Sequence, residues 1–338
     1  MRTTRAICAA AFFTLHVAAC AGSDPKVAFD VVADVSLPGG NSRFDYESLD
    51  ADRHLLFIAH LGASEVLAFD TASRKVVARI KDVSRVHGVL VVPELHRVYA
   101  SATGTDEVVA IDEDTFTIVA RAPGGRYPDG MAYAPEAHKL YVSDETGKTE
   151  TVIDVGSQRR VATIALGGEV GNTQYDAGSK HIFVNVQSRN DLVEIDPADD
   201  RIVRRIPLPG ADGNHGLLID ATRRRAFIAC EDNDKLLVLD LDTRKVESSF
   251  DVGHAPDVLS EDVARGQVYV AGESGIVSIF GIRDGRVAKT KEGFVGTNAH
   301  VVSVDAVRGA AYFPLKDGDA GPVLRIVALE SESPEPSR

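Results

Sequence analysis

The sequence predicts an all-β fold, a seven-bladed β-propeller with four antiparallel strands in each blade. Three observations lead to this prediction. Short runs that hold an aromatic residue between aliphatic ones recur at spacings of 42 to 44 residues. Each of the first six units contains four short runs with strand-like patterning, separated by Gly, Asp, Asn, Ser or Pro. No long stretch has helical periodicity, and four strands in a repeat of this length are typical of a propeller blade.

One marker aromatic identifies each of the seven units. The markers are Phe57, Tyr99, Tyr141, Phe183, Phe227, Tyr269 and Tyr312. In five units an aspartate follows the marker by 13 residues, as in VLAFD. These aspartates are Asp70, Asp112, Asp154, Asp196 and Asp240. A short carboxylate at a strand end accepts backbone hydrogen bonds, so we expect each of them to cap the next turn.

The last unit, from about residue 298 to 330, holds only three strand-like runs. Residues 27–37, VAFDVVADVSL, read like the fourth strand of the other units. We therefore expect the N-terminal strand to complete the last blade, which closes the ring and leaves no long free edge. The propeller is assigned to residues 27–330. The polar, proline-containing tail 331–338 is expected to be disordered.

Residues 1–20 have the pattern of a bacterial export signal: two arginines, an apolar run and small residues before Cys20. The ending VAAC is similar to the lipobox of bacterial lipoproteins, which implies that Cys20 is the lipidated N-terminus. Cleavage beside Cys20 without a lipid is the alternative. We expect a periplasmic protein, or a membrane-anchored lipoprotein, of a Gram-negative bacterium that contacts the membrane only through its lipid.

The charge balance disfavours nucleic acid as a partner. Without residues 1–20, the chain carries 35 basic and 50 acidic residues. A net negative charge repels phosphate backbones at long range. The one dense basic run, at residues 223–225, has the composition of a solvated hairpin turn. Only Cys230 remains after the signal, so the domain depends on its core and not on an internal disulfide.

The repeat resembles a known family. The segment YPDGMAYAPEAHKLYVSDETGKTETVIDVGSQRRVATIALGG is similar to the YVTN repeat, and the order of the units is similar to that of bacterial exported proteins of the YncE-like group. The resemblance covers about residues 27 to 330. It implies the propeller fold strongly and a function only weakly, because propellers host unrelated activities.

A candidate site follows from the repeat. The residue twelve positions before each marker aromatic leads into the first strand of its blade, the strand that lines the channel. These residues are Asp45, His87, Asp129, Gly171, His215, Asp257 and His300, with Asn172 adjacent to Gly171. Equivalent positions in a propeller form a ring, so six ionisable side chains and one amide are expected to face one channel mouth.

Two interpretations of this ring stay open. Imidazole and carboxylate groups bind zinc, copper or, for oxygen ligands, calcium. On this interpretation His87, His215, His300, Asp129 and Asp257 are candidate metal ligands, and Asp45 and Asn172 complete a ligand-binding ring. Alternatively, the same residues are turn residues that hydrogen-bond nearby backbone.

Two function classes fit the sequence. The first is a monomeric binding protein that holds a small molecule, a metal ion or a protein partner at the channel mouth. The second is a metal-dependent enzyme, a lactonase-type hydrolase or a copper oxidoreductase, with a His/Asp centre on the channel axis. The chain contains no G-x-S-x-G, no G-x-x-x-x-G-K-[ST], no G-x-G-x-x-G and no C-x-x-C-H motif. No residue can be assigned a catalytic role from the sequence.

Overall fold

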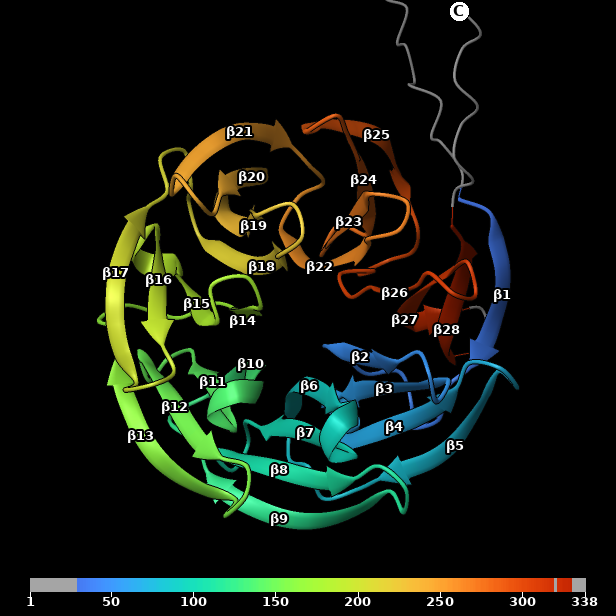
Figure 1. Cartoon of the computed structure of the whole chain (residues 1–338). Helices are drawn as coiled ribbons and strands as arrows, with labels where there is room; N and C mark the ends of the chain where they lie inside the picture. Colours follow the sequence, from blue (N-terminus) through green and yellow to red (C-terminus); the bar gives the residue numbers. More distant parts are fainter. Residues whose placement is uncertain (1–28, 319–320, 330–338) are drawn as a thin grey trace, which may run out of the picture.

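The computed structural model describes residues 29–318 and 321–329. Over these residues the chain forms seven four-stranded antiparallel sheets arranged as blades around a central axis (Figure 1). The predicted fold class, an all-β seven-bladed propeller, is confirmed. The expected export signal, Cys20 and the tail 331–338 lie outside the described residues.

Blades 1 to 6 are each built from four consecutive strands, with the first strand nearest the axis (Figure 1). Blade 1 comprises β2 (Glu47–Asp50), β3 (Leu55–His60), β4 (Glu65–Asp70) and β5 (Lys75–Ile80). Blade 2 comprises β6 (Val86–Val92), β7 (Arg97–Ala102), β8 (Glu107–Asp112) and β9 (Thr117–Pro123). Blade 3 comprises β10 (Pro128–Ala134), β11 (Lys139–Asp144), β12 (Thr149–Asp154) and β13 (Arg159–Ala165).

The second half repeats this plan. Blade 4 comprises β14 (Thr173–Asp176), β15 (His181–Val186), β16 (Asp191–Asp196) and β17 (Arg201–Pro207). Blade 5 comprises β18 (Asn214–Asp220), β19 (Arg225–Cys230), β20 (Lys235–Asp240) and β21 (Lys245–Asp251). Blade 6 comprises β22 (Pro256–Asp262), β23 (Gln267–Gly272), β24 (Ile276–Arg283) and β25 (Arg286–Phe294). Five short 3-10 helices lie in loops: η1 (Leu61–Ala63), η2 (Pro93–Leu95), η3 (Pro135–Ala137), η4 (Gln187–Arg189) and η5 (Glu231–Asn233).

Blade 7 joins the two ends of the chain. It contains β26 (Ser303–Asp305), β27 (Ala310–Gly318) and β28 (Gly321–Ala328), and its outer strand is β1 (Val31–Ser36). Strand β1 pairs antiparallel with β28, and the Arg325 guanidinium donates to the Asp34 carboxylate at 2.8 Å. The predicted closure by the N-terminal strand is therefore confirmed, and the pairing removes a free edge from the ring.

The marker aromatics form the interior of the blades. Each of the seven is at most 2% exposed, and they pack among aliphatic side chains in clusters that join adjacent blades. One cluster, for example, unites Phe57 of blade 1 with Val98 and Ile111 of blade 2. Full burial of one such side chain contributes roughly 1.5–3 kcal/mol, so the regular spacing of aromatics along the sequence supplies the contacts that hold the ring together.

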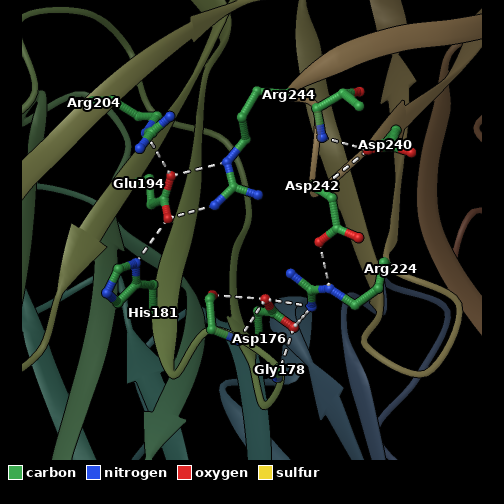
Figure 2. Close-up of polar contacts among 11 residues, drawn as sticks. Asp176, Gly178, His181, Glu194, Arg204, Arg224, Asp240, Asp242 and Arg244 are labelled. Carbon is green, nitrogen blue, oxygen red and sulfur yellow. Dashed lines mark hydrogen bonds and ion pairs between the residues drawn. The ribbon is translucent and has the colours of Figure 1, made fainter.

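Ion pairs tie blade 4 to blade 5 (Figure 2). Arg244 of blade 5 donates to both oxygens of Glu194 in blade 4, at 2.7 and 3.1 Å. His181 and Arg204, both of blade 4, also contact this carboxylate. Arg224 of blade 5 donates to the buried Asp176 of blade 4 at 2.7 and 2.8 Å.

All three arginines of the basic run at residues 223–225 form intramolecular ion pairs. Arg223 pairs with Asp220, Arg224 with Asp176 and Asp242, and Arg225 with Glu247. The five aspartates that end the third strands of blades 1 to 5 cap turns, as the sequence predicts. The Asp240 carboxylate, for example, accepts the amides of residues 242 and 243, which lower its pKa. No helix among the described residues is long and apolar enough to cross a membrane.

Candidate functional site at the channel mouth

Register breaks place four of the ring residues at the axis. In blades 2, 3, 5 and 6 the pairing of the first two strands shifts between the first and fourth residues of the first strand. The ring residues His87, Asp129, His215 and Asp257 are the second residues of these strands and therefore lie inside a bulge. A bulged residue is not held in the regular ladder, and its side chain is re-aimed. In the other three blades the ring residues lie ahead of short inner strands: Asn172 directly precedes β14, Asp45 lies two residues before β2, and His300 lies three residues before β26.

Glycines after the ring positions let the inner strands converge. A Cβ atom at Gly88 would lie 2.1 Å from the Asp129 carbonyl oxygen, and one at Gly216 would lie 1.9 Å from that of Asp257. Any side chain at these two positions would push neighbouring blades apart. The glycine of the repeated motif is therefore required by the close approach of the strands that carry the ring residues.

The ring opens into a cavity of about 620 Å³. Asp45, His87, Asp129, His215 and Asp257 line it, whereas Asn172 and His300 do not. Among the residues that the structure describes, nine carboxylates and two arginines line this cavity. Such an excess of negative charge in a concave site attracts cations and repels anionic ligands.

The three ring histidines share one hydrogen-bonding arrangement. The Nδ1–H of His87 donates to the Arg85 carbonyl at 2.9 Å, and that of His300 donates to the Asn298 carbonyl at 2.9 Å. His215 directs Nδ1 to Oε1 of Gln187 at 3.1 Å. Fixing Nδ1 in this way orients the imidazole and directs Nε2 away from that partner, as in many metal-binding histidines.

The Nε2 atoms have different surroundings. Nε2 of His87 accepts a hydrogen bond from the Tyr127 hydroxyl at 2.9 Å. Nε2 of His215 lies 3.2 Å from the Tyr46 hydroxyl oxygen, 3.8 Å from Oδ1 of Asp257 and 3.9 Å from Oδ2 of Asp129. Nε2 of His300 is buried and has no hydrogen-bond partner among the described residues.

The electrostatics of the ring is dominated by buried carboxyl groups. Asp129 and Asp257 are 3% and 5% exposed, and Oδ1 of each has no hydrogen-bond partner in the described part of the chain. Burial, together with neighbouring carboxylates, raises the pKa of both well above the ordinary value. Burial alone would lower the pKa of His215, but Glu231 and Asp129, among other carboxylates, raise it. Because burial disfavours the charged form of these carboxyl groups, a bound cation would offset that cost and favour their ionised, ligating form.

Tyr46 forms the floor of the cavity. Its hydroxyl donates to Oδ1 of Asn172 at 2.7 Å, and its oxygen accepts the Nε2–H of His215 when that imidazole is protonated. Tyr46 also lines a second cavity of about 380 Å³ in the channel interior, which Asn172 lines as well. The Tyr46–Asn172 hydrogen bond therefore lies between the mouth and the interior of the channel.

Three acidic residues complete the site without having been identified as a set from the sequence. Glu145, Glu231 and Glu273 line the cavity, and each lies four positions after a marker aromatic. Glu231 belongs to the acidic loop at residues 231–234. The equivalent position holds Leu61 in blade 1, so no repeated pattern marked it.

The residues one position earlier are buried inside the blades and not at the mouth. His60, Asp144 and Cys230 each lie three positions after their marker aromatic, and none of them lines the cavity. His60 Nε2 lies 2.9 Å from the Ser42 hydroxyl, and Asp144 accepts the Gly125 amide at 2.8 Å. Burial raises the pKa of the Cys230 thiol to about 12, which keeps it protonated and inert.

Two groups of residues have the geometry to hold a metal ion. His215, Glu231 and Asp257 form one, and Asp257, Glu273 and His300 form the other. Within each group the potential ligand atoms all lie within 4.8 Å of one another. Each group offers one imidazole nitrogen and two carboxylate oxygens. This ligand set suits Zn²⁺ or Mn²⁺ better than Ca²⁺, because Ca²⁺ prefers oxygen ligands alone.

Comparison with known proteins assigns the fold and no family. No protein-family model matches the chain, and no curated protein matches it. Hydrazine synthase of Kuenenia stuttgartiensis is similar in structure, with a TM-score of 0.73, 14% identity and coverage of 91% of this chain and 98% of that chain. The WD40 repeats of RRP9 superpose with a TM-score of 0.76, 10% identity and coverage of 90% and 99%. A chain of a mitotic checkpoint complex superposes with a TM-score of 0.75 and 10% identity, over 98% of this chain and 99% of that chain. These likenesses establish a seven-bladed propeller related in shape to WD40 proteins.

Proposed function

We propose that this protein is a metal-binding β-propeller that holds a divalent transition-metal ion at its channel mouth through His215, Glu231 and Asp257. The observation that carries the proposal is the convergence of these three side chains, one of which, Asp257, has a buried Oδ1 without a hydrogen-bond partner among the described residues. A buried carboxylate oxygen without a donor costs free energy in the folded state, and a bound cation would offset that cost.

The turn interpretation accounts for only part of the ring. His87 and His300 do hydrogen-bond backbone carbonyls two residues earlier, as turn residues would. Those bonds use Nδ1 alone. Oδ1 of Asp129 and of Asp257 makes no backbone contact of this kind, so a second role is needed for these side chains.

The test is metal content. The full chain, purified without a histidine tag from cells grown with zinc, manganese, copper and calcium, is analysed by inductively coupled plasma mass spectrometry. We expect stoichiometric zinc or manganese in the wild type, and loss of the metal in His215→Ala and Asp257→Asn. His254→Ala is the matched control, because the side chain of His254 is 77% exposed and lies away from the cavity lining. The proposal would be overturned if the wild type contains no metal and its melting temperature does not change when zinc or manganese is added.

A second function, hydrolysis of a small ester or lactone by the bound ion, is favoured by the cavity. Its volume of about 620 Å³ lies in the range of small-molecule sites, and it leaves room above the metal ligands. A metal lowers the pKa of bound water and polarises a carbonyl oxygen. Metal-loaded protein is assayed against a panel of uncharged lactones and aryl esters. Turnover that disappears in His215→Ala would support an enzyme, and absence of turnover with the metal retained leaves a binding protein.

The location of the protein is part of the proposal. The resemblance to YVTN-repeat proteins of the YncE-like group, and the pattern of residues 1–20, support an exported protein lipidated at Cys20. Radiolabelled palmitate should be incorporated into the wild type and not into Cys20→Ala. Incorporation into neither, with the protein in the periplasmic fraction, would favour a secreted form without a lipid.

A further inference from the structure

Asp257 belongs to both candidate metal groups. It faces His215 and Glu231 of blade 5 on one side, and Glu273 of its own blade and His300 of blade 7 on the other. We propose that the channel mouth holds two metal ions bridged by the Asp257 carboxylate, with Glu273 and His300 as ligands of the second ion. This inference rests on the proposed function, because it extends the His215 site to a two-metal centre.

The position of Asp257 suits a bridging ligand. The side chain is 5% exposed and enters the mouth from the bulge in β22. The Val258 amide donates to the His300 carbonyl at 3.2 Å, which holds the two neighbouring inner strands together beside the carboxylate. A carboxylate has two oxygens and can bridge ions that lie roughly 3.5–4 Å apart, the separation found in two-metal sites.

His300 supplies the observation that is independent of the acidic cluster. His300 is 1% exposed, and its Nδ1–H donates to the Asn298 carbonyl. Its Nε2 has no hydrogen-bond partner among the described residues. A buried imidazole nitrogen without a hydrogen bond loses its solvation without compensation. Coordination to an ion shared with Asp257 and Glu273 would compensate it.

Arg43 occupies part of the second position in the metal-free protein. Its guanidinium lies 2.7 Å from Oε1 of Glu273 and 3.6 Å from Oδ2 of Asp45, and its side chain is 39% exposed. Asn298 donates to the other oxygen of Glu273. A second ion must therefore displace the Arg43 guanidinium from Glu273. The arginine side chain is partly exposed and can turn toward solvent. We expect the second ion to bind more weakly than the first.

The experiment counts ions on the full chain. Metal-free protein is dialysed to equilibrium against Zn²⁺, and a parallel sample is loaded with Mn²⁺ for electron paramagnetic resonance. We expect two zinc ions per chain, and an exchange-coupled manganese spectrum that needs no variant to interpret. His300→Gln, with its fold checked by circular dichroism, should bind one ion and lose the coupling. Asp257→Asn should lose the coupling as well and bind at most one ion weakly.

The outcomes separate the two proposals. No bound metal overturns the proposed function and this inference together. One ion per chain, with an uncoupled manganese spectrum and no change in His300→Gln, leaves the His215 site standing and overturns the two-metal centre.

A charge variant tests the role of Arg43. Arg43→Gln should tighten the second ion by roughly threefold to fivefold, the scale of one partly exposed ion pair. Arg85→Gln is the matched control, since Arg85 lines the same cavity but makes no ion pair with Glu273 among the described residues. Equal gains in the two variants would overturn the displacement of Arg43 by the second ion.

Discussion

Nε2 of His215 lies 3.8 Å from Oδ1 of Asp257, across the boundary between blades 5 and 6. The distance is too long for a hydrogen bond and short enough for both atoms to bind one ion. Neither side chain is near the other in sequence, and each reaches the axis because the inner strands of adjacent blades converge. The pH dependence of stability and the affinity for metal should both depend on this pair and on Gln187, which orients His215.

The metal-free protein should lose stability as pH rises from 6 to 8. The folded-state pKa values of Asp129 and Asp257 lie above their unfolded values, so the folded state binds more protons and loses stability as pH rises through those folded-state values. His215 acts in the same direction, because a raised pKa stabilises the fold at low pH and the contribution is lost as the imidazole deprotonates. Urea unfolding of the metal-free chain should show a loss of about 1–2 kcal/mol. A gain in stability over this interval would contradict the prediction, and Asp257→Asn should flatten the dependence.

Metal affinity should depend on Gln187 although this residue is not a proposed ligand. Its Oε1 atom holds Nδ1 of His215 at 3.1 Å and so orients the imidazole toward Asp257. Loss of such a support typically costs about 10–100-fold in metal affinity. Isothermal titration with Zn²⁺ should show this loss in Gln187→Leu and recovery in Gln187→Glu, which keeps an acceptor at the same place. Equal affinity of all three proteins would show that Gln187 does not position His215.

The ring could be predicted from the sequence because each member occupies an equivalent place in a repeat of constant length. Equivalent places in a propeller meet at the axis, so distant residues such as His87 and Asp257 could be grouped without any local motif. The sequence did not predict which way these side chains point. A one-residue register shift decides whether a side chain lies in a bulge or in the ladder, and the repeat alone does not indicate it.

Glu231 and Cys230 show why the rest of the site was missed. Adjacent side chains at a strand end point in opposite directions, so Cys230 packs into the blade core while Glu231 faces the mouth. The marker aromatic sets the approximate place of the loop but not the phase of this alternation. The interblade pairs of Glu194 and Asp176 escaped prediction for a different reason, because long side chains from separate repeats meet only in three dimensions.

Replacing Glu150 by leucine should stabilise the protein. Both carboxylate oxygens are buried without a hydrogen-bond partner among the described residues, and burial raises the pKa well above the ordinary value. Four other blades have an aliphatic residue here: Val66, Val108, Leu192 and Leu236. Removing a buried polar group that lacks a partner should increase the free energy of unfolding by roughly 1–3 kcal/mol. Chemical denaturation at pH 7.5 measures the change. Glu150→Gln is the control that removes the ionisable group and keeps its shape, and destabilisation by leucine would indicate a partner for this carboxyl.

Glu194 should contribute more to stability than a surface pair of the same charges. Its carboxylate is 2% exposed, and it joins Arg244 of blade 5 to His181 and Arg204 of blade 4 (Figure 2). Glu194→Gln leaves the two arginines without their shared counter-ion, so we expect a loss of roughly 1–3 kcal/mol, seen as a lower urea midpoint with an unchanged slope. Lys235→Met is the matched control. It removes a pair in which Asp251 is 84% exposed, and exposed pairs contribute at most about 1 kcal/mol. Equal effects of the two substitutions would mean that solvent screens the Glu194 cluster as fully as the surface pair, and that the contact between blades 4 and 5 depends on its apolar core.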